Sequence, residues 1–74
     1  MPTVDMIKTG DNIQTLRKES GLSIRDMQEI FGFTSGNAIY KWINGQSMPT
    51  IDNLVILASI FNTTIDSIIA IKII

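Results

Sequence analysis

The stretch from Leu22 to Gly45 constrains the fold more than any other part of the sequence. It reads LSIRDMQEIFGFTSGNAIYKWING, so glycine, serine and threonine separate two segments that contain regularly spaced apolar residues. Residues of these three types favour turns and helix ends over helix interiors. The stretch therefore predicts two short helices joined by a tight turn that contains glycine.

Residue types separate cleanly around the second of these helices, which we expect from about Ser35 to Asn44. Four residues that can form hydrogen bonds fall at i, i+3, i+4 and i+7 and share one face: Asn37, Tyr40, Lys41 and Asn44. The other side is apolar and includes Trp42, whose phase predicts a core residue. The major groove of DNA accepts such a helix and offers hydrogen-bond partners to amide, phenol and ammonium groups.

Composition excludes several classes of protein. The chain has 74 residues, which is enough for one small domain, and its hydrophobic content of 45% argues against disorder. It has no cysteine and no histidine, which removes disulfides, cysteine nucleophiles and the usual zinc sites. We find no phosphate-binding glycine loop and expect no enzyme activity, metal, cofactor or small-molecule ligand. No apolar run approaches the roughly 20 residues of a membrane span, so we expect a cytoplasmic protein.

The charge balance is nearly even, with six basic and seven acidic residues and a formal net charge of −1. This composition argues against strong binding to nucleic acid, because domains with that function are usually basic. The position of the charges matters more than their sum. Only Lys72 among the basic residues lies beyond Lys41.

The apolar spacing and the capping residues predict a compact all-α domain of five helices without a strand. Ser23 is a good N-cap, and Asp26 three residues later gives a shortened capping box. Thr34 and Ser35 are both candidate N-caps for the third helix. The expected helices are Thr9–Ser20, Ser23–Phe31, Ser35–Asn44, Thr50–Phe61 with Thr50 as N-cap, and a fifth that begins near Thr63 or Thr64 and extends to Ile71.

The C-terminal half contains more apolar residues than one small core needs. The helix expected from Thr50 packs through Leu54, Leu57, Ala58 and Phe61, and this leaves other apolar residues unassigned. Exposed apolar clusters usually mark an interface, so one interpretation is a symmetric homodimer. The other is that the tail folds back over the first helix and completes the core. The candidate dimer surface comprises Val55, Ile56, Ile60, Ile71, Ile73 and Ile74.

The segment from Gly10 to Ala70 resembles the lambda-repressor-like DNA-binding domains of the XRE family, which include phage repressors and Cro. The resemblance depends on the joint spacing of landmarks along most of the chain. The string AIYKW, followed by NG, a proline and DNLVIL, is similar to a subgroup found among regulators of Gram-positive bacteria. The landmarks are Ile13, Leu16, Arg17, Gly21-Leu22-Ser23, Met27, Phe31-Gly32-Phe33, Ile39, Trp42, Gly45, Pro49, Leu54, Leu57, Ala58, Phe61 and Ile65-Asp66.

The resemblance implies that the second and third helices form a helix-turn-helix and that the third enters the major groove. It places four residues against base edges: Gly36, Asn37, Tyr40 and Lys41. It places the start of the second helix and the segment after the third helix against phosphates. With the basic residues and cap nearby, the candidate phosphate contacts are Arg17, Lys18, Ser23, Arg25, Ser35, Asn44, Gln46 and Ser47.

The sequence departs from the family pattern at several positions. Ile24 and Gln28 stand where many relatives have glutamine and alanine, respectively. Ile43 stands where relatives commonly have a glutamate that pairs with the equivalent of Arg17. Arg17 must therefore find another acceptor, face water or meet a phosphate. The turn is also one residue longer than in most relatives.

These features predict a sequence-specific DNA-binding transcriptional regulator, with repression as the simplest mode. The alternative is an antitoxin-like or other protein-interaction module on the same fold, which the low net charge and the apolar C-terminus would suit. Salt-dependent binding to DNA distinguishes the two interpretations.

Overall fold

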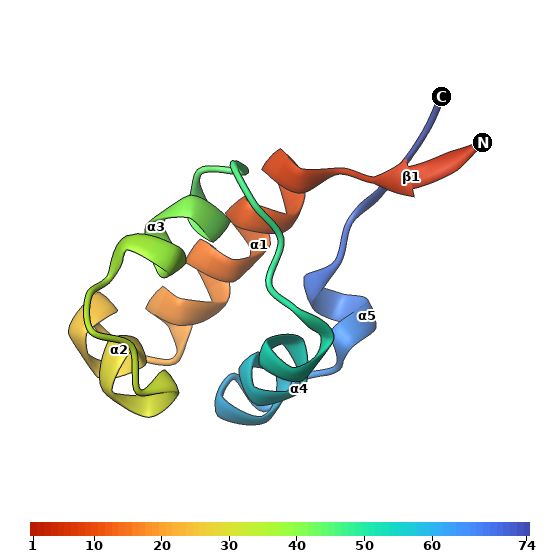
Figure 1. The fold of residues 1–74 in the computed structure, drawn as a ribbon. Coiled ribbons are helices and arrows are strands. Elements are labelled where there is room, and N and C mark those ends of the chain that lie inside the picture. The colour runs from red at the N-terminus through yellow and green to blue at the C-terminus, as the bar shows by residue number, and fades with distance from the viewer.

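The computed structural model describes all 74 residues and contains five helices and two short strands (Figure 1). The predicted all-α, five-helix architecture is confirmed, whereas the prediction that there is no strand is wrong. The elements are β1 (Pro2–Val4), α1 (Met6–Glu19), α2 (Ile24–Phe31), α3 (Asn37–Ile43), α4 (Ile51–Ile60), α5 (Ile65–Ile68) and β2 (Ile71–Ile73). No helix combines the length and the apolar character needed to cross a membrane.

Hydroxyl caps begin three of the helices at the predicted residues. The side chains of Ser23, Thr50 and Thr64 each accept a hydrogen bond from the backbone amide three residues later. Each cap satisfies one of the amides that has no partner within its helix. The start of α1 was predicted too late, because Asp5 caps this helix by accepting from the Lys8 amide at 3.0 Å.

Two helices are shorter than predicted. Gly36 is the N-cap of α3 and makes no side-chain cap bond, so neither Thr34 nor Ser35 caps this helix. α5 ends at Ile68 instead of Ile71, and Ile69 is already extended with ψ of 126°. Isoleucine is β-branched and suits an extended backbone, which explains why the isoleucine-rich tail leaves the helix.

All five helices contribute to one core. Its fully buried side chains lie at the positions that the apolar spacing predicted, and Trp42 is only 4% exposed. Gly10 lets α1 approach α3 closely, because a side chain there would collide with the backbone carbonyls of Trp42 and Ile43. The core residues are Ile13, Met27, Ile39, Trp42, Leu54, Leu57, Phe61 and Ile68.

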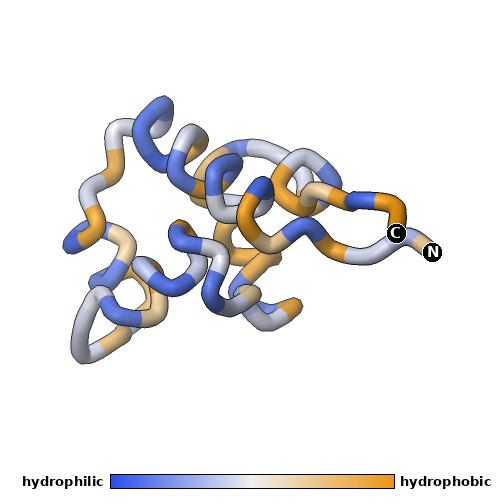
Figure 2. Tube along the Cα trace, turned by 90° about the horizontal axis from the view of Figure 1, so that it is seen from above, coloured by the Kyte–Doolittle hydropathy of each residue, from blue (hydrophilic) through white to orange (hydrophobic).

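The two ends of the chain pair as antiparallel strands, with Thr3 opposite Lys72. We call β1 and β2 together the terminal ribbon. It lies at the far end of the molecule from α2 (Figure 1), and Figure 2 shows its C-terminal segment mostly apolar. The interpretation that the tail completes the core is confirmed for Ile68, which is fully buried, but not for the exposed isoleucines of β2.

Hydrogen bonds to α1 hold the terminal ribbon in place. The Ala70 amide donates to Thr9 Oγ1 at 2.9 Å, and Asn12 Nδ2 donates to the Ile68 carbonyl at 3.0 Å. The Asp5 amide donates to the Ala70 carbonyl at 2.8 Å. Thr9 is buried, so its hydroxyl is an internal anchor for the chain that leads into β2.

Candidate nucleic-acid interface

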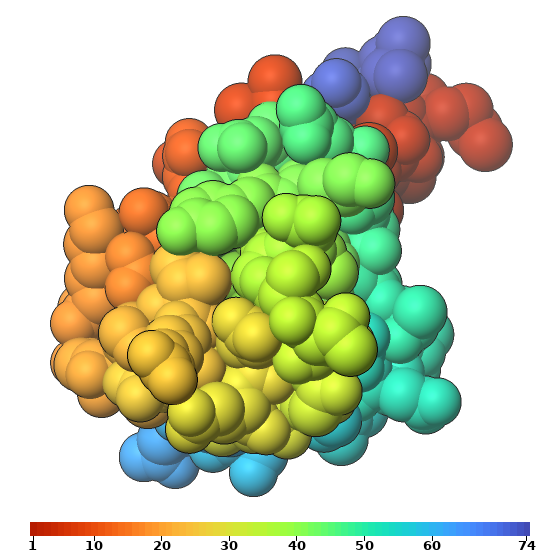
Figure 3. Space-filling view, turned by 60° about the vertical axis from the view of Figure 1, so that its left-hand side comes forward, coloured from red at the N-terminus to blue at the C-terminus, as the bar shows by residue number.

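α2 and α3 lie side by side on one face of the molecule (Figure 3). Gly32 caps the C-terminus of α2, and its φ of 70° is a left-handed conformation that glycine adopts without strain. The Phe33 amide donates to the Gln28 carbonyl at 3.0 Å and closes the turn. The chain then enters α3 through Gly36.

Three aromatic rings fix the arrangement of the two helices and their turn. Phe31 stacks on Phe33 with 5.3 Å between ring centroids. Trp42 meets the same two rings edge-on, at 5.4 and 5.9 Å. Because the rings come from α2, the turn and α3, their packing holds these three parts as one unit.

The exposed side of α3 carries the four polar residues that share its predicted face. Asn37, Tyr40, Lys41 and Asn44 are all exposed, while Ile39 and Trp42 point into the core. We call the four exposed residues the polar face of α3. The tyrosine side chain is about half-exposed, at 52%. This orientation agrees with the phase derived from the sequence and leaves amide, hydroxyl and ammonium groups free for a partner.

Gly36 differs from the other three candidate base contacts, because its surroundings give it a packing role. A Cβ there would lie 2.9 Å from Ile24 Cγ2 and 3.3 Å from Tyr40 Cε2. The residue therefore allows α3 to begin close to α2. Its neighbour Ser35 accepts a hydrogen bond from the Asn37 amide at 3.3 Å.

The N-terminus of α2 is closed by a complete capping box, as the sequence predicted. The Asp26 amide donates to Ser23 Oγ and the Ser23 amide donates to Asp26 Oδ2, both at 2.9 Å. The hydrogen bond from the Ser23 amide, followed by the one that involves its side chain, lowers the pKa of Asp26. An ionised carboxylate therefore lies at the end of α2 that was expected to face a phosphate.

Arg17 finds its acceptor inside the chain. Its Nη1 donates to the Leu22 carbonyl at 2.7 Å and its Nε donates to Gln14 Oε1 at 2.9 Å. These two bonds take the place of the glutamate partner that the family resemblance implied. The bond to Leu22 ties α1 to the segment that leads into α2, whereas the bond to Gln14 lies within α1. Part of the donor capacity of the guanidinium is therefore used within the fold.

The other candidate phosphate contacts remain available on the surface. Lys18, Asn44 and Gln46 are exposed, and Ser47 is half-buried. Arg25 Nε lies 3.7 Å from Glu29 Oε1, but both side chains are largely exposed, at 87% and 70%. Such a surface ion pair contributes little, so the guanidinium can exchange this partner for another anion.

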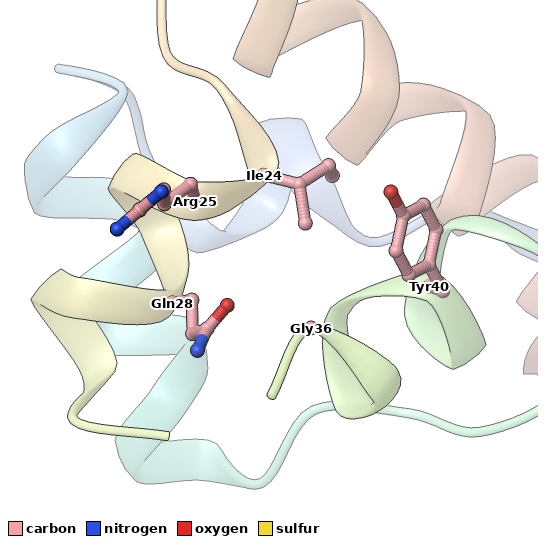
Figure 4. Close-up of a pocket in the computed structure, with 5 residues that line it drawn as sticks. All are labelled: Ile24, Arg25, Gln28, Gly36 and Tyr40. Atoms are coloured by element: carbon pink, nitrogen blue, oxygen red, sulfur yellow. The ribbon is translucent and has the colours of Figure 1, made fainter. Parts of the chain in front are cut away.

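One hollow opens between α2 and α3 and has a volume of about 400 Å³. Figure 4 shows the Gln28 amide on one side of it and the Tyr40 ring on the other. Sequence reasoning noted Gln28 only as a departure from the family pattern. Its position one helical turn after Ile24 was the available signal, because both residues then lie on the same side of α2. The lining residues are Ile24, Arg25, Gln28, Gly36 and Tyr40.

The six residues proposed as a dimer surface do not form one continuous patch. Val55 and Ile56 are exposed on α4, whereas Ile60 is half-buried and packs against the core. Ile71 and Ile73 belong to β2, and Figure 1 shows the C-terminal tail extending beyond α5, away from α4. Ile74 extends the ribbon, because its amide donates to the Met1 carbonyl at 2.9 Å.

The sequence model of the helix-turn-helix family matches residues 13–68. The match extends from the middle of α1 to the end of α5 and includes α2, the glycine turn and α3. No curated protein and no solved structure matches the chain.

Proposed function

This chain belongs to the lambda-repressor-like (XRE) helix-turn-helix family of DNA-binding transcription regulators, and we propose that it reads an operator with α3 in the major groove. The observation that carries the proposal is the orientation of α3. Trp42 and Ile39 hold the helix from behind, while its polar face is exposed. In this arrangement the side chains that specify sequence project from a rigid support.

The chemistry of the polar face suggests which bases it reads. An asparagine amide can make two hydrogen bonds to adenine, and a lysine ammonium can donate to the acceptors of guanine. Asn37 and Lys41 lie one turn apart on the face, so they reach neighbouring base pairs. Gly36 contributes indirectly, because the absence of a side chain there lets α3 begin close to Ile24 of α2.

Phosphate contacts position the domain on the duplex. Lys18 and Arg25 supply exposed cations, and the segment from Asn44 to Ser47 supplies polar groups after α3. The small number of cations predicts a shallow dependence of affinity on salt, because the slope of log affinity against log salt is roughly −0.9 per phosphate neutralised. Occupation of an operator would most simply repress transcription by excluding the polymerase.

A homodimer would place two α3 helices on one operator, and the terminal ribbon supports this second proposal. Residues opposite each other in the ribbon share a face, so Pro2, Val4, Ile71 and Ile73 form one apolar face. Ile71 and Ile73 are 67% and 77% exposed. A two-stranded ribbon is marginally stable in water, and packing against the same face of a second copy would stabilise it.

Selection of bound duplexes from a random library, followed by gel shifts at increasing salt, tests the DNA-binding proposal. We expect one enriched half-site and an affinity that falls as salt rises. A shift that is absent at low salt on every duplex, together with a protein that co-purifies with the chain, would favour the interaction module instead.

Sedimentation velocity at micromolar concentration tests the dimer. We expect a dimer for the wild-type chain and a monomer for Ile73→Lys, which places a charge on the apolar face of the terminal ribbon. A monomeric mass for the wild-type chain would contradict this proposal without touching the DNA-binding proposal.

A further inference from the structure

The hollow between α2 and α3 gathers hydrogen-bond donors that the fold itself does not use. Gln28 is half-buried at the hollow and Tyr40 is exposed beside it. Neither the Gln28 amide nor the Tyr40 hydroxyl makes a hydrogen bond within the chain. These two groups therefore differ from Ser23 and Arg17, whose hydrogen bonds hold the start of α2.

The residues that line the hollow can accept an anion. They include the cation Arg25 and no carboxylate, and the Arg25 side chain is 87% exposed and can exchange its weak contact with Glu29, 3.7 Å away, for another anion. Figure 4 shows the Gln28 amide beside the hollow and the Tyr40 ring across from it, with the Arg25 guanidinium extending outward from α2. The amide can turn about its last bond to direct its NH2 group inward, and the tyrosine can donate through its hydroxyl.

We propose that this hollow is a phosphate subsite, in which Gln28 and Tyr40 donate hydrogen bonds to one backbone phosphate of the bound duplex while Arg25 supplies positive charge. The inference rests on the proposed DNA binding and adds Gln28 of α2 to the contacts made there. It also makes Tyr40 a residue that positions the duplex, and it leaves base reading to Asn37 and Lys41.

The shape of the site distinguishes a phosphate from a base edge. The hollow lies beside α3 and is open to solvent, so a projecting backbone group can enter it while α3 occupies the groove. A phosphate accepts hydrogen bonds through all of its free oxygens and needs only donors. The volume of about 400 Å³ also leaves room for waters that bridge the phosphate to the protein.

A double-mutant cycle between the protein and the duplex tests the subsite. The selected operator is synthesised with one neutral methylphosphonate at a time, and each duplex is titrated with wild-type protein, Gln28→Ala and Tyr40→Phe. We expect Gln28→Ala to weaken wild-type operator binding by roughly tenfold, since hydrogen bonds to charged groups are the stronger ones. At one phosphate position the methylphosphonate should weaken wild-type binding but leave the two variants little changed, and the other positions serve as internal controls.

Two further substitutions separate hydrogen bonding from packing. Gln28→Leu keeps the side-chain volume and should bind like Gln28→Ala, whereas Gln28→Glu places a negative charge in the hollow and should bind more weakly than either. Thermal melts of the free proteins exclude loss of fold as the cause.

Three results would overturn the subsite while leaving the proposed function intact. These are additive effects at every phosphate position, an altered base preference in Gln28→Ala, and operator affinity of Gln28→Glu equal to that of the wild-type chain. Failure of the wild-type chain to bind any duplex at low salt would overturn both proposals.

Discussion

The helix-turn-helix unit and the terminal ribbon, at the two ends of the molecule, are held by different interactions and leave different groups on their surfaces. Around α2 and α3, side-chain packing of Phe31, Phe33 and Trp42 holds the backbone and leaves polar groups on the surface. In the ribbon, backbone hydrogen bonds hold the chain and leave apolar side chains on the surface. The groups that each end leaves unused are the basis of the two proposals, DNA binding through α3 and self-association through the terminal ribbon.

The largest effect should come from removing the ring that joins α2, the turn and α3. Trp42→Ala should lower the free energy of unfolding by about 3–5 kcal/mol, because it leaves a large cavity in the core. Thermal denaturation checks this, and an unchanged melting temperature would show that packing does not hold this end together.

Truncation of the polar face of α3 should change binding without changing stability. Asn37→Ala should relax sequence preference, and Lys41→Ala should weaken binding to the operator. Each lost base contact should cost about 1–3 kcal/mol of binding free energy. Titration of the operator and of single-base variants provides the measurement. If both proteins bound like the wild-type chain, the reading residues would lie elsewhere on the surface.

The hydrogen bond between Thr9 and the Ala70 amide gives a corresponding test for the terminal ribbon. Thr9→Val keeps the side-chain shape but removes the acceptor for the Ala70 amide, which should cost about 1–3 kcal/mol for an amide left without its partner. Hydrogen exchange should accelerate in β1 and β2 while protection around α3 stays unchanged. Equal acceleration in the terminal ribbon and around α3 would show that the two regions open together instead of independently.

The smallest effect should be on the dependence of the free energy of unfolding on acidic pH. The lowered pKa of Asp26 means that its capping bonds stabilise the fold above the pKa of the unfolded carboxyl, about 3.9, and that this contribution is lost as pH falls through the lower folded value. Asp26→Asn should therefore remove part of the acid dependence of unfolding between these two pKa values. Denaturant titrations from pH 2 to pH 7 check this, and identical curves for both proteins would exclude the effect.

The sequence was informative wherever the deciding interactions were local. Regular apolar spacing located the core and the phase of α3, and the hydroxyl caps Ser23 and Thr50 marked helix starts because each bonds an amide three residues away. The candidate polar face of α3 followed from the same periodicity. Helical spacing also places Ile24 and Gln28 on one side of α2, but the hollow itself depends on how closely α2 and α3 approach, which periodicity does not reveal.

The unpredicted features depend on residues far apart in the chain. β1 and β2 are short strands at opposite ends of the sequence, and a run of three residues gives too little alternation to distinguish a strand. The role of Gly10 could not be predicted from its position in the sequence. Glycine is needed there because the backbone of α3 packs directly against it. The acceptor of Arg17 is a main-chain carbonyl, which no side-chain pattern marks.

The aromatic contacts of α3 have a practical consequence, because Trp42 is the only tryptophan of the chain. Its indole is buried and touches rings from α2 and from the turn. Intrinsic fluorescence therefore reports on the integrity of the helix-turn-helix unit without a label. Emission that shifts to longer wavelength before helicity is lost would identify this end as the first to loosen.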